Sequence, residues 1–81
     1  MSPAETAIIE LLLQRGAGKT ICPSEAAHQL AGPHGEWREQ MDAVHGAVDT
    51  MLEAGTIVLT WKGEPKRERR GPYRIARGPR M

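Results

Sequence analysis

A few side chains in this sequence have types and spacings that could support chemistry. Asp42, His45 and Asp49 are three and four residues apart, so they share one face of a helix, where a carboxylate can orient a histidine for base catalysis. No nucleophile, oxyanion-hole glycine pattern or cofactor motif accompanies them. Because catalysis needs a constellation rather than a pair, we interpret them as an exposed polar face with a His45–Asp49 pair. We expect no catalytic residue and no enzyme.

Potential metal ligands are scattered along the chain. Zinc sites show closely spaced ligand pairs, whereas the candidates here are Cys22, His28, His34 and His45, with no histidine pair at helical spacing. We therefore expect neither a metal nor a cofactor. Cys22 stands at a predicted helix start, a position that can make a thiol reactive, so a reactive thiol stays open as an alternative.

The segment 16–20 resembles the end of a phosphate-binding loop. That motif needs an earlier glycine at the position of Leu13, a preceding strand and a following helix. Here a helix precedes and an extended piece follows. The segment is predicted to be a turn with a solvated Lys19, and no small-molecule substrate is evident.

The strongest chemical signal is a cluster of cations near the C-terminus, which would bind phosphates. The cluster comprises Lys62, Lys66, Arg67, Arg69 and Arg70, followed by Arg74 and Arg77. Arg74 alternates with Tyr73 and Ile75, so we expect it to face solvent. A mobile, solvated loop that keeps a sheet edge soluble is the alternative interpretation.

The formal net charge of +1 hides an uneven distribution. Residues 1–54 hold three basic and eight acidic side chains, a net −5, and residues 55–81 hold eight basic and two acidic ones, a net +6. Such asymmetry predicts that the basic part meets a polyanion or the acidic part of another molecule.

Helices are predicted at about 3–15, 23–31 and 36–54 from apolar residues at helical spacing and from their start and stop signals. Ser2 and Pro3 start the first helix and Gly16 ends it. Pro23 opens the second, and Gly55 ends the third. Trp37 continues the apolar face of the third helix, so we expect it in the core.

Strands are predicted at about 19–21, 56–61 and 72–77, because these segments are β-branched, aromatic or alternating. The last two would form a hairpin around a basic loop at 62–71, and 78–81 would be a frayed tail. Trp61 is expected in the core at the sheet edge, with a half-exposed position beside the loop as the alternative.

The order helix, strand, helix, helix, strand, basic loop, strand is that of a winged helix-turn-helix. We expect a single α+β domain over residues 1–77, with three helices on a two- or three-stranded antiparallel sheet. The basic loop would be the wing.

The chain also resembles the DUF3253 family of small bacterial winged-helix domains of unknown function. The resemblance covers nearly the whole chain and rests mainly on the segment Gly18-Lys19-Thr20-Ile21-Cys22-Pro23-Ser24-Glu25. Further matches are Trp37-Arg38, Glu53-Ala54-Gly55-Thr56-Ile57, Lys62-Gly63 and Arg70-Gly71-Pro72-Tyr73-Arg74. It implies a winged-helix fold, and it carries no activity.

The third helix is a poor candidate for reading bases, because it holds five acids and one arginine, Arg38. We therefore predict weak, non-specific binding of DNA or RNA through the basic loop and last strand, with Arg38 as the helix's only cationic contact. The alternative is a protein-interaction module, in which an acidic third helix meets the basic loop of a second copy or of a partner protein.

Composition sets the class of protein. The length of 81 residues suits one domain, and a single cysteine excludes an internal disulfide. No apolar run is long enough for a membrane span, and the N-terminus lacks the pattern of a signal peptide. We therefore expect a cytoplasmic location and no membrane partner.

Overall fold

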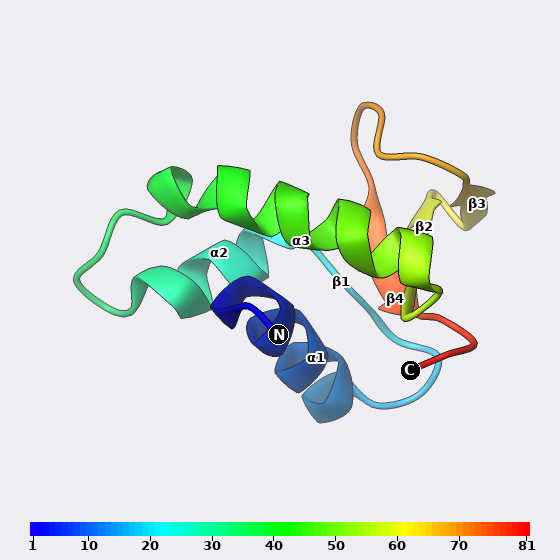
Figure 1. Cartoon of the computed structure of the whole chain (residues 1–81), viewed down its shortest axis with the longest axis horizontal. Helices are drawn as coiled ribbons and strands as arrows, with labels where there is room; N and C mark the ends of the chain where they lie inside the picture. Colours follow the sequence, from blue (N-terminus) through cyan, green and yellow to red (C-terminus); the bar gives the residue numbers. More distant parts are fainter.

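Three helices form one layer of the molecule in the computed structural model, which describes all 81 residues (Figure 1). The predicted α+β class is confirmed. The helical elements are α1, Pro3–Arg15; α2, Pro23–Ala31; and α3, Met41–Ala54, which follows the short 3-10 helix η1, Trp37–Gln40.

The ends of α1 and α2 are set by local hydrogen bonds. The Ser2 Oγ accepts a hydrogen bond from the Glu5 N–H at 3.2 Å, and the Gly16 N–H donates to the Leu12 carbonyl at 3.1 Å. At the start of α2, the Cys22 N–H donates to the Glu25 carboxylate at 2.6 Å. Glu25 also pairs with Arg15, so the end of α1 and the start of α2 are joined.

The predicted third helix is divided in the structure. Residues 37–40 form the tighter η1, and the α-helix begins at Met41. Trp37 of η1 stacks on His28 of α2, with 4.8 Å between ring centroids. Periodicity alone could not show this division, because a contact with another helix shapes the first turn.

The second layer is an antiparallel sheet of four strands in the order β1-β4-β2-β3. The expectation of two or three strands is therefore wrong by one strand, β3. The strands are β1, Thr20–Ile21; β2, Ile57–Trp61; β3, Glu64–Lys66; and β4, Arg74–Arg77.

β3 was missed because it contains Pro65 and lies within the predicted loop. A proline is tolerated in an edge strand, where its missing N–H need not join the ladder. β3 is such an edge, and it pairs with β2 through a two-residue turn, Lys62-Gly63. Both turn residues have positive φ, 52° and 82°, as the tight hairpin turn between twisted strands requires.

The core lies between the helices and one sheet face. Its largest fully buried side chains come from α1, β1, α3, β2 and β4: Ile8, Leu12, Ile21, Val44, Val48, Ile57, Leu59 and Ile75. Trp37 is half-buried against this core. Trp61 is 37% exposed, so the alternative placement of Trp61 beside the loop is the correct one.

The C-terminal tail is held in place, contrary to the expectation that it frays. The Gly78 N–H donates to the Thr56 carbonyl at 2.8 Å, and the Arg80 N–H donates to the Gly55 carbonyl at 2.9 Å. A side chain at position 78 would meet the Gly55 carbonyl oxygen at 2.4 Å, so glycine is needed for this close approach.

Candidate nucleic-acid interface

The basic loop, residues 62–71, projects from the end of the sheet next to α3 (Figure 1). It consists of the Lys62-Gly63 turn, β3 and the segment 67–71 that leads back toward β4. Sequence reasoning assigned seven cations of this region to one site. The structure gives them different surroundings.

Lys66 faces into the loop rather than outward. Its Nζ donates hydrogen bonds to the carbonyl oxygens of Arg70 and Pro72, the latter at 2.9 Å. One ammonium thus closes the segment 66–72 on itself. Its role in the structure is to shape the loop.

Arg69 ties the loop to α3. Its Nε lies 2.9 Å from one Asp49 oxygen and its Nη2 lies 3.1 Å from the other, a bidentate pair. The hydrogen bond from Arg69 lowers the pKa of the Asp49 carboxyl. The sequence predicted a pair between Asp49 and His45. In the structure Asp49 pairs with Arg69 of the loop instead.

A second link joins α3 to the end of the loop. The His45 Nδ1 lies 2.7 Å from the hydroxyl oxygen of Tyr73, the buried residue before β4. Burial raises the pKa of Tyr73 to about 12. Burial, together with the charge of Arg69, lowers the pKa of His45. Near neutral pH this contact therefore joins a neutral His45 imidazole to a protonated Tyr73 phenol.

Arg74 and Arg77 of β4 are part of the fold. Arg74 was expected to face solvent, but it is half-buried, and its Nε donates to the Thr20 Oγ1 of β1 at 2.7 Å. The Arg77 Nη2 donates to the Leu12 carbonyl, at the C-terminal end of α1, at 3.2 Å. Its Nε is buried without a hydrogen-bond partner.

Arg38 lies apart from the basic loop, because η1 and the loop are at opposite ends of α3 (Figure 1). Its guanidinium covers the Trp37 ring at 4.5 Å and lies 3.5 Å from the Glu36 carboxylate. The structure therefore does not bring Arg38 together with the other predicted site residues.

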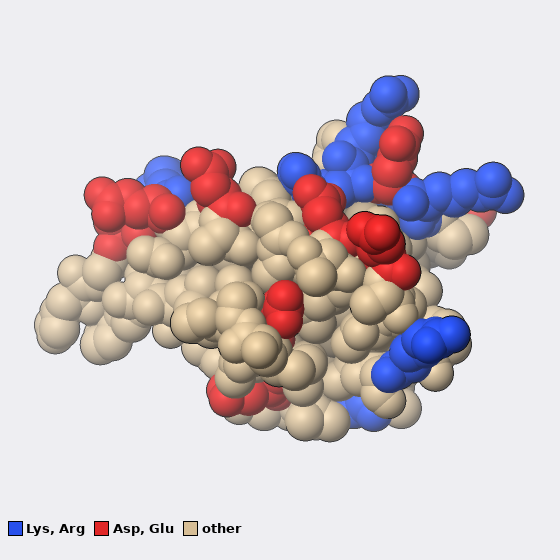
Figure 2. All heavy atoms as spheres, viewed as in Figure 1, with Lys and Arg blue, Asp and Glu red and all other residues tan.

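Three of the predicted cations are exposed at the loop and, unlike Arg69, make no close ion pair: Lys62, Arg67 and Arg70. Lys62 and Arg67 are in no ion pair, and the Arg70 side chain is 86% exposed with only a 3.8 Å contact to Glu68. Figure 2 shows Lys and Arg side chains gathered on the projecting end of the molecule, with acidic side chains along the neighbouring helical surface.

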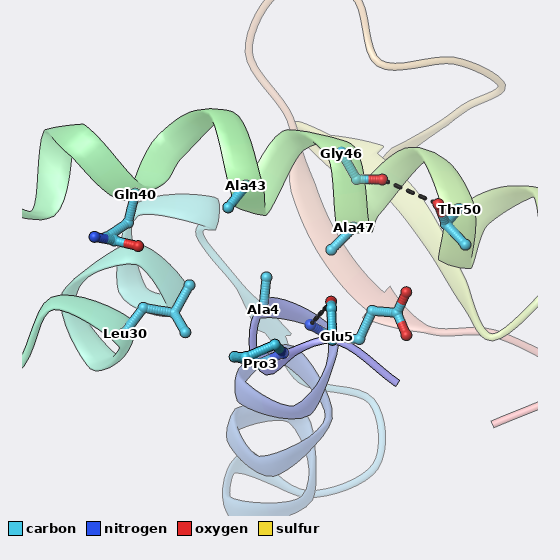
Figure 3. Close-up of a pocket in the computed structure, with 10 residues that line it drawn as sticks. Pro3, Ala4, Glu5, Leu30, Gln40, Ala43, Gly46, Ala47 and Thr50 are labelled. Carbon is cyan, nitrogen blue, oxygen red and sulfur yellow. Dashed lines mark hydrogen bonds between the residues drawn. The ribbon is translucent and has the colours of Figure 1, made fainter.

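A separate groove of about 470 Å³ lies between α3, the start of α1 and the end of α2 (Figure 3). Small residues of α3, Ala43, Gly46 and Ala47, leave the space open. Thr50 bonds back to its own helix, and Glu5 is the groove's only charged side chain. No set of polar groups for catalysis converges there.

The remaining candidates for chemistry are separated in space. No three histidine, cysteine, aspartate or glutamate side chains form a cluster that could hold a metal ion. The Cys22 Sγ lies 3.2 Å from the Ser24 Oγ. None of the helices has the length and apolar character needed to cross a membrane.

Comparison with known proteins identifies the family of the chain. No curated protein matches the chain. Residues 1–78 match the family described as "Protein of unknown function (DUF3253)". The matched range includes the three helices, the sheet and the basic loop. Since the match spans nearly all of the 81 residues, the chain belongs to the DUF3253 family.

Proposed function

We propose that this domain binds nucleic acid weakly and with little sequence preference through Lys62, Arg67 and Arg70. The observation that carries the proposal is the exposure of these three cations on a projecting loop whose shape is set by other residues. Cations presented in this way bind phosphates and release counterions without reading bases. The proposal is for a cytoplasmic binding domain rather than an enzyme.

The proposal also includes a winged-helix arrangement, supported by the order of helices and strands. In such a fold α3 would be the recognition helix. Its exposed acidic side chains without an ion pair include Asp42 and Glu53, which would repel a phosphate backbone. The basic loop, as the wing, would therefore lead the contact.

The test is a binding titration at several salt concentrations between about 50 and 200 mM. Replacing Lys62, Arg67 and Arg70 with alanine should lower affinity and reduce the slope of log K against log salt by about two to three, since each phosphate contact contributes about 0.7–0.9. The matched control is Lys62→Arg, Arg67→Lys and Arg70→Lys, which keeps the charge and should keep the slope. An unchanged slope in the alanine variant, or no binding at low salt, contradicts the proposal.

A second candidate function is self-association, in which the basic loop of one copy meets the α3 acids of another. The separation of cations on the loop from the exposed acids of α3 favours it. Asp42→Asn with Glu53→Gln distinguishes the two candidates. The double variant should bind nucleic acid more tightly at low salt if the loop meets a polyanion. It should instead weaken a salt-sensitive oligomer, measured by light scattering, if the loop meets α3.

A further inference from the structure

Trp61 is a large aromatic side chain that the core does not use. It is the last residue of β2, and it is 37% exposed. By strand alternation it shares a sheet face with Ile57 and Leu59, which are fully buried, but it lies beyond the end of the core. Trp37, in contrast, packs against the core and stacks on His28.

Trp61 stands at the base of the basic loop. Lys62 follows it directly, and the strand register places Glu64 of β3 opposite it. The same hairpin leads into the segment that carries Arg67 and Arg70. An exposed indole and three exposed cations therefore belong to one projecting unit of the structure.

We propose that Trp61 stacks on an unpaired base while Lys62, Arg67 and Arg70 hold the neighbouring phosphates, so that the preferred ligand is single-stranded nucleic acid. This inference rests on the proposed function and names the class of ligand. An exposed aromatic ring stacks on any base, because every base has a π-face. In a duplex the bases are stacked on one another and cannot reach the indole.

The charge distribution favours the same ligand. A duplex carries one negative charge for about every 1.7 Å of its length on two backbones. A duplex lying along the loop would bring its second backbone toward the acidic side chains on the neighbouring helical surface (Figure 2). A single strand has one backbone and can follow the loop alone.

The experiment uses the full chain with Trp37→Phe, which leaves Trp61 as the only tryptophan. The probes are an oligothymidine of about 12 nucleotides, within the roughly 4–16 nucleotides that small single-strand binding folds cover, and a duplex of similar length. Binding is followed by anisotropy of a label on the nucleic acid and, separately, by Trp61 fluorescence. Stacking should quench Trp61 with the single strand and leave it nearly unchanged with the duplex.

Trp61→Ala should lower single-strand affinity by about 5- to 150-fold, and its effect on the duplex should be much smaller. Trp61→Phe, which keeps an aromatic face, should restore most of the affinity. Circular dichroism of both variants checks that the fold is intact, as expected for a side chain outside the core.

The two levels of the proposal fail in different ways. Anisotropy binding without quenching of Trp61, or an equal loss for single strand and duplex in Trp61→Ala, overturns the stacking role and leaves the loop as a phosphate-binding site. Absence of binding to both probes at low salt overturns the proposed function and the stacking role together.

Discussion

Arginines that look alike in the sequence have different surroundings in the folded chain. Arg67 and Arg70 are exposed on the loop, whereas Arg69 is held by Asp49 of α3. Arg74 bonds to Thr20, and Arg77 bonds to the last turn of α1. A guanidinium with five donors can satisfy either a phosphate or the protein's own acceptors, and its neighbours decide which. Formal charge therefore overstates the cations available to a ligand.

The lowered pKa of His45 predicts that the stability of the folded chain depends on pH. Burial lowers its folded pKa below the ordinary 6.5, so between the two values the unfolded chain binds more protons than the folded one. Stability from this group is complete above about pH 6.5 and is lost as the pH falls through the folded value. Urea unfolding at about pH 7.5 and pH 5.5 should show a larger loss in the parent chain than in His45→Gln. The extra loss of unfolding free energy in the parent chain, relative to His45→Gln, should be well under about 1.4 kcal/mol per pH unit, the limit for one proton.

Equal losses in the two proteins would show that other groups cause the acid sensitivity. Tyr73→Phe provides a control, because it removes the hydroxyl that meets His45 and leaves the imidazole free to titrate. The pH-dependent part of the stability should then persist.

At the scale of elements, the basic loop is held by links that are separate from its free cations. Lys66 closes the loop on itself, Arg69 binds Asp49, and Tyr73 meets His45. The Arg69–Asp49 pair and the Tyr73–His45 contact both anchor the loop to α3. A loop fixed in this way loses less conformational entropy when it binds a ligand.

Asp49→Asn tests the link to α3. The variant should loosen the loop because it removes the carboxylate that Arg69 binds, and amide hydrogen exchange at 67–71 should rise roughly severalfold while the core is unchanged. In the parent chain the pKa of Asp49 is lowered, so the link is complete above the ordinary value of 3.8 and is lost as the pH falls through the folded value. The Arg69 Nε–H signal in an NMR titration should report that loss.

Asp42→Asn is the matched control for this experiment, because it removes an α3 carboxylate that has no partner on the loop. Unchanged exchange at 67–71 in Asp49→Asn would mean that Lys66 and the Tyr73–His45 contact order the loop without the Arg69–Asp49 pair.

At the scale of the whole molecule, the net charge of +1 is divided between an acidic helical layer and a basic hairpin. The Arg69–Asp49 pair crosses the boundary and neutralises one charge of each part. Acidic side chains remain on the helical surface next to the loop (Figure 2), so they restrict the direction from which a polyanion can approach. A narrow, single-backbone ligand fits this arrangement better than a wide one.

Much of the architecture was predictable from local signals. The caps at Ser2 and Gly16, the proline at the start of α2 and the Gly55 stop lie where the helices begin and end, because capping depends on nearby residues. The hidden strand β3 was not predictable from propensity, because Pro65 and its charged neighbours form a strand only against β2.

The residue types and their order in the chain determine the α+β class, the uneven charge and the position of the basic loop. These properties follow from composition and local periodicity, which need no knowledge of distant contacts. Only the tertiary structure decides which cations are free, which are bound by Asp49, Thr20 or Leu12, and that Trp61 is exposed. The physical reason is that hydrogen bonds and burial depend on partners up to 65 residues away in the chain, whereas charge and propensity belong to each residue alone.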